Sequence, residues 1–285
     1  MKLFRFGKIG HETAGAVLPD GTRIDCSAFG EDWNEQFFGS GGLSRLASWI
    51  ERDGPAAPRV ADDVRLGAPI CRPSKIVCIG LNYRDHAAET GAELPAEPVI
   101  FFKSTTAIVG PHDDVLLPPA STKSDWEVEL AVVVGATLSY ADRQTASDGI
   151  AGYCLHNDLS EREFQLERCG QWVKGKSCNT FAPLGPELVT PDELPDPLHL
   201  DMWLKVNGEE LQRSNTRELH FDVPAILSSV SQYMTLLPGD VISTGTPAGV
   251  GLGLDPPRFL KAGDVMELFI EGLGSQRQEV CAFDQ

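Results

Sequence analysis

The sequence predicts a β-rich α+β fold with a small N-terminal domain. Short β-type runs outnumber amphipathic helical patterns after residue 70, and the two do not alternate as they would in a doubly wound α/β sheet. The chain has 285 residues, of which 42% are hydrophobic and 23% are charged, as is ordinary for a globular protein. This length allows one large domain or two unequal ones.

The first 70 residues predict a small N-terminal α/β domain in which we expect no catalytic residue. A Pro-Asp-Gly turn separates strand-like runs, and glycine, proline and alanine after residue 52 are typical of a linker. We therefore divide the chain into an N-terminal domain, 1–70, and a catalytic domain, 71–285. The expected N-terminal elements are strands at Phe4–Gly7, Thr13–Val17 and Arg23–Cys26 and a helix near Leu43–Arg52.

The catalytic part is predicted to contain more strands than helices. The expected strands are Lys75–Ile79, Val99–Lys103, Val128–Val134, Gly149–Asn157, His199–Val206, Val241–Thr244 and Val265–Ile270. The expected helices are Asn82–Thr90, Asp142–Ser147, Glu161–Arg168 and Val223–Tyr233. The glycine-rich stretch 245–253 lacks the spacing of a dinucleotide-binding loop, so it predicts either a plain turn cluster or an irregular loop that approaches a ligand.

Composition argues against several classes of function. A net charge of −17 disfavours nucleic acid as a partner, because phosphate binding needs a basic surface. The sequence contains no run of 18 apolar residues, which a membrane-spanning helix would need. Its first residues lack the apolar region of a signal peptide. The seven cysteines form no Cys-x-x-Cys pair, which favours reduced thiols over disulfides or a zinc site. These features predict a cytoplasmic protein.

Glu127 and Glu129 are the first candidate site residues. They stand two apart, directly before the apolar run Leu130–Val134, so on a strand both carboxylates point to one face. Two adjacent carboxylates repel each other and resist burial, and a hard divalent cation such as Mg²⁺, Mn²⁺ or Ca²⁺ would relieve both problems. The alternative is that both side chains lie on a solvated strand face.

His86 and Glu89 form a second candidate. They are three residues apart, so on a helix they share a face, and a carboxylate beside a histidine is one way to build a water-activating base. An ordinary surface pair is the alternative. Asp158 ends a strand-like run and offers a third oxygen ligand, or it caps the following helix with Glu161 completing a capping box.

Further candidates follow Asp158 along the chain. Arg162 and Gln165 are spaced to face one carboxylate together, whereas Glu161 and Glu163 fit a solvated helix surface. Lys176 stands in an alternating Lys-x-Lys pattern, and a lysine near a metal can stabilise a developing oxyanion. An exposed lysine pair is the alternative.

In order, these elements resemble the fumarylacetoacetate hydrolase superfamily. The resemblance covers residues 71 to about 272 and rests on the ordered set rather than on any single motif. The matching motifs are Gly80-Leu-Asn-Tyr-x-x-His86-x-x-Glu89, Glu97-Pro-Val-Ile-Phe-Phe-Lys103, Glu127-x-Glu129, Asp158-x-x-x-Arg162-x-x-Gln165, Lys176-Ser177 and Thr244-Gly-Thr246-Pro-x-Gly-Val-Gly251.

The resemblance implies a rolled mixed β-sheet, a homodimer and a site for Mg²⁺ or Mn²⁺. By residue, it implies metal ligation by Glu127, Glu129 and Asp158, and water activation by His86 and Glu89. It implies a catalytic role for Lys176. It also implies substrate contacts by Arg162, Gln165 and Thr246.

The resemblance also implies a small 2-oxo acid substrate and a metal-dependent hydrolase acting on carbon–carbon bonds. The pattern looks most like bacterial enzymes that cleave 2,4-diketo-3-deoxy-L-rhamnonate or L-fuconate to pyruvate and lactate. The enzyme alternatives are a 2-oxo-acid decarboxylase, a hydroxyheptadienedioate-type isomerase and a ureidoglycolate lyase. The non-enzyme alternative is a silent metal-binding scaffold.

Overall fold

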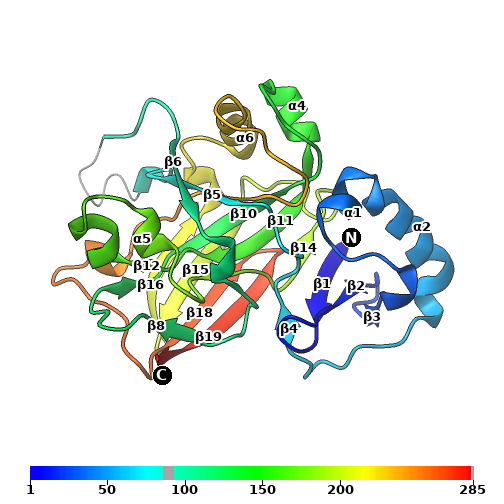
Figure 1. Ribbon diagram of the computed structural model, residues 1–285, viewed down its shortest axis with the longest axis horizontal. Helices are drawn as coiled ribbons and strands as arrows, with labels where there is room; N and C mark the ends of the chain where they lie inside the picture. Colours follow the sequence, from blue (N-terminus) through cyan, green and yellow to red (C-terminus); the bar gives the residue numbers. More distant parts are fainter. Residues whose placement is uncertain (86–92, 284–285) are drawn as a thin grey trace.

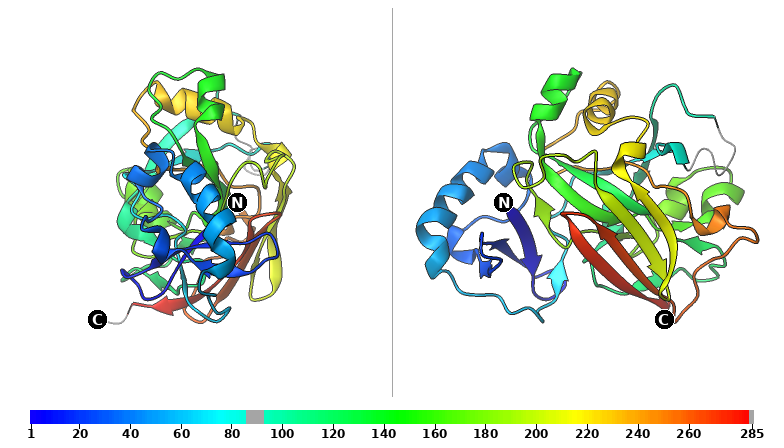
Figure 2. Two further views of the ribbon diagram at one scale, coloured as in Figure 1. Left: turned by 90° about the vertical axis from the view of Figure 1, so that its right-hand side faces the viewer. Right: turned by 180° about the vertical axis from the view of Figure 1, so that it is seen from behind.

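The computed structural model describes residues 1–85 and 93–283. Figures 1 and 2 show the N-terminal helices α1 and α2 (blue) at one end of the molecule, beside a larger β-rich part. The predicted β-rich α+β class is confirmed, because strands outnumber helices among the described elements and most of the strands belong to two sheets.

The N-terminal segment forms a three-stranded meander followed by helices. The predicted strands and the predicted helix are present, and α1 is an addition that the sequence pattern did not predict. Asn34 caps α1, since its side chain accepts a hydrogen bond from the Phe37 N–H, and five residues are too few for a visible helical period. The elements are β1 Lys2–Phe6, β2 Thr13–Val17, β3 Arg23–Asp25, α1 Glu35–Gly39 and α2 Gly42–Asp53.

The large sheet runs through both parts of the chain in the order β3-β2-β1-β14-β11-β10-β17-β5-β6. Its other strands are β4 Leu66–Gly67 (paired with β1), β5 Ile76–Gly80, β6 Val99–Lys103, β10 Val128–Val134, β11 Ile150–Asn157, β14 Leu188–Val189 and β17 Val241–Ser243. Strand β17 pairs parallel with β5, and the other pairs along this order are antiparallel, so the sheet is mixed. Because β1 pairs with β14, the N-terminal strands extend the sheet of the larger part. The predicted domain boundary near residue 70 stays a prediction.

A second sheet has the order β16-β15-β18-β19-β8. Its strands are β8 Val115–Leu117, β15 Asp201–Val206, β16 Glu209–Asn215, β18 Val265–Ile270 and β19 Gly274–Ala282. The sequence pattern predicted β15 and β18 but not β16 and β19. Those two strands are rich in polar residues, so pairing with neighbours rather than apolar alternation defines them.

The remaining elements are short, and two predictions about them need correction. Segment 161–168 is not one α-helix: β12 ends at Glu161, and a π-helical turn follows. Lys174 and Lys176 lie on the single helical turn α5, not on an alternating strand. The elements are α4 Arg143–Asp148, α5 Val173–Lys176, α6 Val223–Ser231, the π-turn Glu163–Glu167, β7 Ile108–Val109, β9 Ser124–Asp125, β12 Ser160–Glu161 and β13 Ala182–Pro183.

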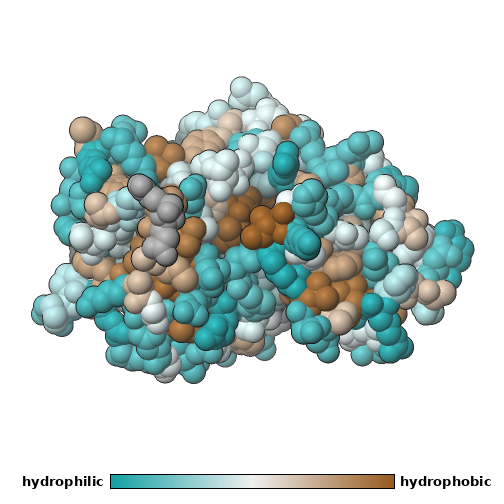
Figure 3. Space-filling view, turned by 60° about the horizontal axis from the view of Figure 1, so that its bottom comes forward, coloured by the Kyte–Doolittle hydropathy of each residue, from teal (hydrophilic) through white to brown (hydrophobic). Residues whose placement is uncertain are grey.

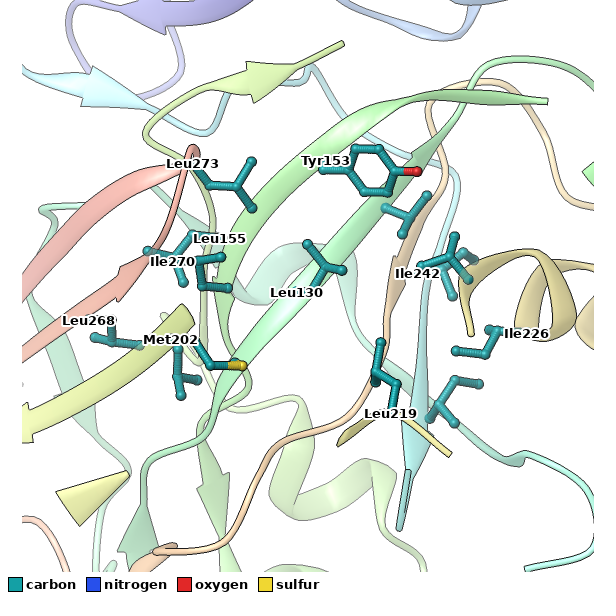
Figure 4. Close-up of a cluster of buried hydrophobic side chains, with 14 of the residues drawn as sticks. Leu130, Tyr153, Leu155, Met202, Leu219, Ile226, Ile242, Leu268, Ile270 and Leu273 are labelled. Atoms are coloured by element: carbon teal, nitrogen blue, oxygen red, sulfur yellow. The ribbon is translucent and has the colours of Figure 1, made fainter. Parts of the chain in front are cut away.

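Side chains alternate along β10 between two buried faces. The face that carries Leu130 packs against the second sheet and α6, and Figure 4 shows part of this apolar cluster. The opposite face carries Ala131 and Val133, which pack with apolar residues of the N-terminal segment. Glu127 and Glu129 continue this second face toward the start of the strand, as period-two alternation requires.

Among the described residues, no helix is long and apolar enough to cross a membrane. The face shown in Figure 3 is mostly hydrophilic, and its apolar residues gather in a few separate patches.

Gln212 of β16 ties the second sheet to the start of β10. Its buried side chain accepts a hydrogen bond from the Val128 N–H at 3.0 Å and donates to Thr246 Oγ1 and to the Pro247 carbonyl, both at 2.9 Å. These bonds join three segments at the point where the Glu127–Glu129 pair begins.

Replacing this amide is expected to destabilise the fold. Gln212→Leu leaves buried donors and acceptors without partners, so the free energy of unfolding should fall by about 2–4 kcal/mol. Urea denaturation measures the change. Gln144→Leu on exposed α4 is the matched control and should change it by less than about 0.5 kcal/mol. Equal losses in the two variants would contradict the structural role of Gln212.

Candidate metal centre and its cavity

The antiparallel pairing of β10 with β11 brings three carboxylates together. Glu129 lies opposite His156 in this ladder, and the Asp158 N–H donates to the Glu127 carbonyl at 2.9 Å. Asp158 therefore lies opposite Glu127, although the two are 31 positions apart in sequence. One carboxylate oxygen from each of Glu127, Glu129 and Asp158 lies within 4.8 Å of the others, and all three residues are buried.

Two buried lysines neutralise much of this negative charge. Lys176 Nζ lies 2.7 Å from Glu127 Oε2 and 2.8 Å from Asp158 Oδ2. Lys103, at the end of β6, places its Nζ 2.6 Å from Asp158 Oδ1 and 2.9 Å from the Leu159 carbonyl. Asp158 thus joins two lysines from separate segments of the chain.

Arg162 adds a third cation beside Glu127. Its Nη2 lies 2.7 Å from Glu127 Oε1, and its Nε donates to Asp125 Oδ2 at 2.8 Å. Its Nη1 donates to Gln165 Oε1 at 3.0 Å, so the two side chains lie together, and their joint contact with a carboxylate stays a prediction. Asp125 also accepts the Gly251 N–H at 2.6 Å.

The glycine-rich stretch approaches protein backbone and Asp125 closely at Gly251. A Cβ at this residue would lie 2.0 Å from the Arg258 carbonyl oxygen and 2.8 Å from Asp125 Oδ1. Only glycine fits that space, which explains one glycine of the 245–253 run by packing. The same run supplies Thr246 to the cavity described below.

Glu129 is held by donors from β17 and the following loop. Its Oε2 accepts from Ser243 Oγ at 2.5 Å and from the Gly245 N–H at 2.9 Å. His156 Nδ1 lies 2.7 Å from Ser243 Oγ, while its buried Nε2 has no hydrogen-bond partner among the described residues. With Glu129 ionised, Ser243 donates to the carboxylate and must accept from His156, so the proton of this neutral imidazole is on Nδ1.

Burial and charge shift the pKa values of these groups in different directions. Burial lowers the pKa of His156 to about 3, so the ring is neutral. Burial also raises the pKa of Glu129 well above its usual value, and the negative charges of Asp158 and Glu127 add to that rise. Burial opposes ionisation of Lys176 and of Asp158. Even so, mutual ion pairing raises the pKa of the lysine and, with Lys103, lowers that of the aspartate.

These shifts fit a site for a hard divalent cation. The four described carboxylates, with Asp125 included, outnumber Lys103, Lys176 and Arg162 by one negative charge. A divalent cation would reverse that excess and relieve the mutual repulsion that opposes ionisation of Glu129. Convergent carboxylate oxygens without nitrogen or sulfur donors suit Mg²⁺ or Mn²⁺.

The carboxylate cluster opens into a cavity of about 300 Å³. Of the predicted site residues, Glu127, Glu129, Arg162, Gln165, Lys176 and Thr246 line it. The Thr246 hydroxyl donates to the Val128 carbonyl at 3.0 Å, so it is anchored to the start of β10. His86 and Glu89 lie outside the described residues, and their pairing stays a prediction.

The solvated strand face for Glu127 and Glu129 and the exposed position for Lys176 are wrong, because all three residues are buried. Two further alternatives from the sequence do not agree with the structure. Asp158 caps no helix, because β12 follows it and its carboxylate binds lysines. Glu161 is buried rather than solvated, and its Oε2 accepts hydrogen bonds from Ser121 and from Ser124 Oγ. A polar residue can be buried here because hydroxyl groups satisfy it.

Sequence reasoning assigned no role to Lys103, Asp125, His156 or Ser243. A signal existed for two of them. Lys103 ends an apolar run, where a charge needs a buried partner, and Asp125 precedes Glu127 by the same two-residue step that joins Glu127 to Glu129. His156 and Ser243 lie in otherwise apolar strands, and nothing local indicates their partner.

Comparisons with known proteins show the family of this chain. The profile of the fumarylacetoacetate (FAA) hydrolase C-terminal family matches residues 75–281. A Burkholderia lata relative, provisionally named a hydrolase, is 50% identical over 279 residues, which cover 98% of each chain.

Solved structures cover the whole fold, including the N-terminal segment. Fumarylacetoacetate hydrolase from Exiguobacterium antarcticum is 36% identical with a TM-score of 0.87, covering 99% of this chain and 100% of that one. Maleylpyruvate hydrolase from Sphingobium sp. SYK-6, solved with manganese and pyruvate, is 31% identical with a TM-score of 0.83 and full coverage of both chains. A 2-hydroxyhepta-2,4-diene-1,7-dioate isomerase from Mycobacterium marinum is 33% identical with a TM-score of 0.74, also with full coverage of both. The chain belongs to the fumarylacetoacetate hydrolase family.

Proposed function

We propose that this protein is a metal-dependent hydrolase that cleaves a carbon–carbon bond of a 2,4-dioxo acid, releasing pyruvate and a second carboxylic acid. The observation that carries the proposal is the cluster of three buried carboxylates beside the cavity, two of which, Glu127 and Asp158, pair with Lys176. The maleylpyruvate hydrolase solved with manganese and pyruvate supports it, since a metal and an oxo acid of these kinds are what the proposal needs.

We assign different roles to the carboxylates and to the polar residues of the cavity. A Mg²⁺ or Mn²⁺ ion held by Glu127, Glu129 and Asp158 would supply Lewis-acid polarisation of the 2-oxo acid. Arg162 and Gln165 lie together in the cavity wall and are proposed to bind the substrate's carboxylate. Thr246 is proposed to contact the same end of the substrate.

Lys176 is proposed to stabilise the oxyanion at C4. Its ammonium group stays protonated, because two carboxylates raise its pKa, so it acts as a hydrogen-bond donor and not as a base. Water adds to the C4 carbonyl, the C3–C4 bond breaks as the oxyanion collapses, and the enolate of pyruvate takes up a proton at C3. His86 and Glu89 are proposed to remove the proton from the attacking water.

Within this class, the family branch that cleaves 2,4-diketo-3-deoxy-L-rhamnonate or L-fuconate stays a prediction, as does a homodimer. The second candidate function is isomerisation of a 2-hydroxydienedioate. The similarity to the Mycobacterium marinum isomerase favours it. A metal held by the same carboxylates would stabilise an enolate formed during isomerisation.

A substrate screen separates these reactions. With Mg²⁺ or Mn²⁺, the protein is expected to release pyruvate from acetylpyruvate, and a chelator should stop the release. Pyruvate is quantified enzymatically, and oxaloacetate and a 2-hydroxydienedioate are assayed in parallel. Turnover of oxaloacetate alone would indicate a decarboxylase, and interconversion of the dienedioate alone would indicate an isomerase.

Glu127→Gln tests the metal centre without relying on activity. Mutating a residue that only hydrogen-bonds to a metal ligand lowers metal affinity by about 10- to 100-fold. Removing the charge of a ligand itself should therefore lower Mn²⁺ affinity by at least about 100-fold. Isothermal titration calorimetry measures it. Glu267→Gln, on β18 of the second sheet, is the control and should bind like the wild type. An affinity within twofold of wild type for Glu127→Gln would disprove metal ligation by this residue.

His86→Ala tests the proposed base. A general base contributes about 10²- to 10⁴-fold, so kcat for pyruvate release should fall by that factor while Mn²⁺ affinity changes little. Steady-state kinetics and calorimetry on the same preparation give both values. Equal losses in kcat and in metal affinity would show that the histidine is structural.

A further inference from the structure

The cavity beside the carboxylate cluster has a second, chemically different wall. Its charged lining residues are all members of the cluster, and the other lining side chains, apart from Gln165 and Thr246, are apolar. The apolar wall, as we define it, consists of Leu81, Phe101, Leu166, Trp172, Val250 and Leu252.

Phe101 joins the apolar wall to the catalytic cluster. Lys176 Nζ lies 4.9 Å from the centre of the Phe101 ring, and the Trp172 ring meets Phe101 edge-on at 5.3 Å. Gly80 makes room for this tryptophan, because a Cβ there would lie 3.0 Å from the indole ring. A substrate held near Lys176 would therefore extend its far end along aromatic rings.

Leu81 enters this wall at a conformational cost. Its φ is +56°, in the left-handed region that leucine rarely adopts. The next residue holds the backbone there, since the Asn82 side chain donates to the Thr244 and Phe221 carbonyls at 2.8 and 3.0 Å. Asparagine or glycine would adopt this φ more easily, so the leucine side chain has a use other than local folding.

The wall also includes apolar side chains that solvent reaches. Leu166 is 45% exposed and Leu252 is 38% exposed, and both line the cavity. Exposed apolar residues that gather around a cavity commonly mark a binding surface.

We propose that this wall selects 2,4-dioxo acids whose C4 acyl group is an apolar alkyl or aryl chain. The inference rests on the proposed function. A hydroxyl group on the chain would lose its hydrogen bonds to water against these side chains, and a second carboxylate would find no cation in the wall among the described residues. The wall therefore favours apolar acylpyruvates over the hydroxylated sugar acids.

A matched pair of substrates tests the selection directly. The two acids 2,4-dioxohexanoate and 5-hydroxy-2,4-dioxohexanoate differ by one hydroxyl, and kcat/KM should be about tenfold higher for the first. It should also rise about tenfold or more from 2,4-dioxopentanoate to 2,4-dioxononanoate, as methylene groups enter the wall. A preference for the hydroxylated acid, or no dependence on chain length, would overturn the proposal.

Leu81→Asn tests the wall residue whose backbone lies in the left-handed region. Asparagine suits that backbone, so the melting temperature should stay equal or rise, while the preference for 2,4-dioxononanoate over 2,4-dioxopentanoate falls about tenfold. Ile9→Asn, an exposed position at the N-terminal end, is the control and should keep the wild-type preference. An unchanged preference in Leu81→Asn would count against the wall.

A binding experiment separates failure of this inference from failure of the proposed function. If no 2,4-dioxo acid is cleaved, the hydrolase assignment fails. Calorimetry with the Mn²⁺-loaded protein then compares pyruvate with 2-oxooctanoate. An affinity about tenfold higher for the longer acid supports the apolar wall, and equal affinities refute it.

Discussion

The buried ion pairs around Asp158 and Glu127 are the constraint on which the site depends. Both carboxylates pair with Lys176, while Lys103 pairs also with Asp158 and Arg162 also with Glu127. A buried charge that loses its partner costs about 3–5 kcal/mol, so the segments carrying these cations must cover this face of the large sheet. The same ion pairs keep the carboxylates close together, with one oxygen of each of Glu127, Glu129 and Asp158 within 4.8 Å of the others.

Strand alternation keeps the site separate from the main core. Leu130 and its neighbours on one face of β10 pack against the second sheet, whereas Glu127 and Glu129 occupy the other face. A shift of one residue in the β10–β11 pairing would exchange the two sets, placing carboxylates in the apolar core. The apolar face therefore specifies the register that brings the three carboxylates together.

The N-terminal segment covers a different part of the face that carries the site. Leu3, Trp33 and Phe37 pack in one apolar cluster with Ala131 and Val133 of β10. The same strand thus connects the packing of this segment to the carboxylates at its start. This contact gives a segment without proposed catalytic residues a structural reason to stay attached to the catalytic part.

Local pattern alone determined the strand 128–134, the shared face of Glu127 and Glu129, and the β-rich class, because alternation and propensity act between near neighbours. The ordered motifs predicted the family and grouped Asp158 with Glu127 and Glu129. Only the tertiary structure decided that Lys103 meets Asp158 and that Ser243 meets Glu129, since 55 and 114 residues separate these pairs. It also decided that segment 161–168 is no regular helix, because Glu161 turns inward to buried hydroxyl groups. Partners that meet across a sheet leave no periodic trace in the sequence, so their pairing follows from how the strands are ordered and covered.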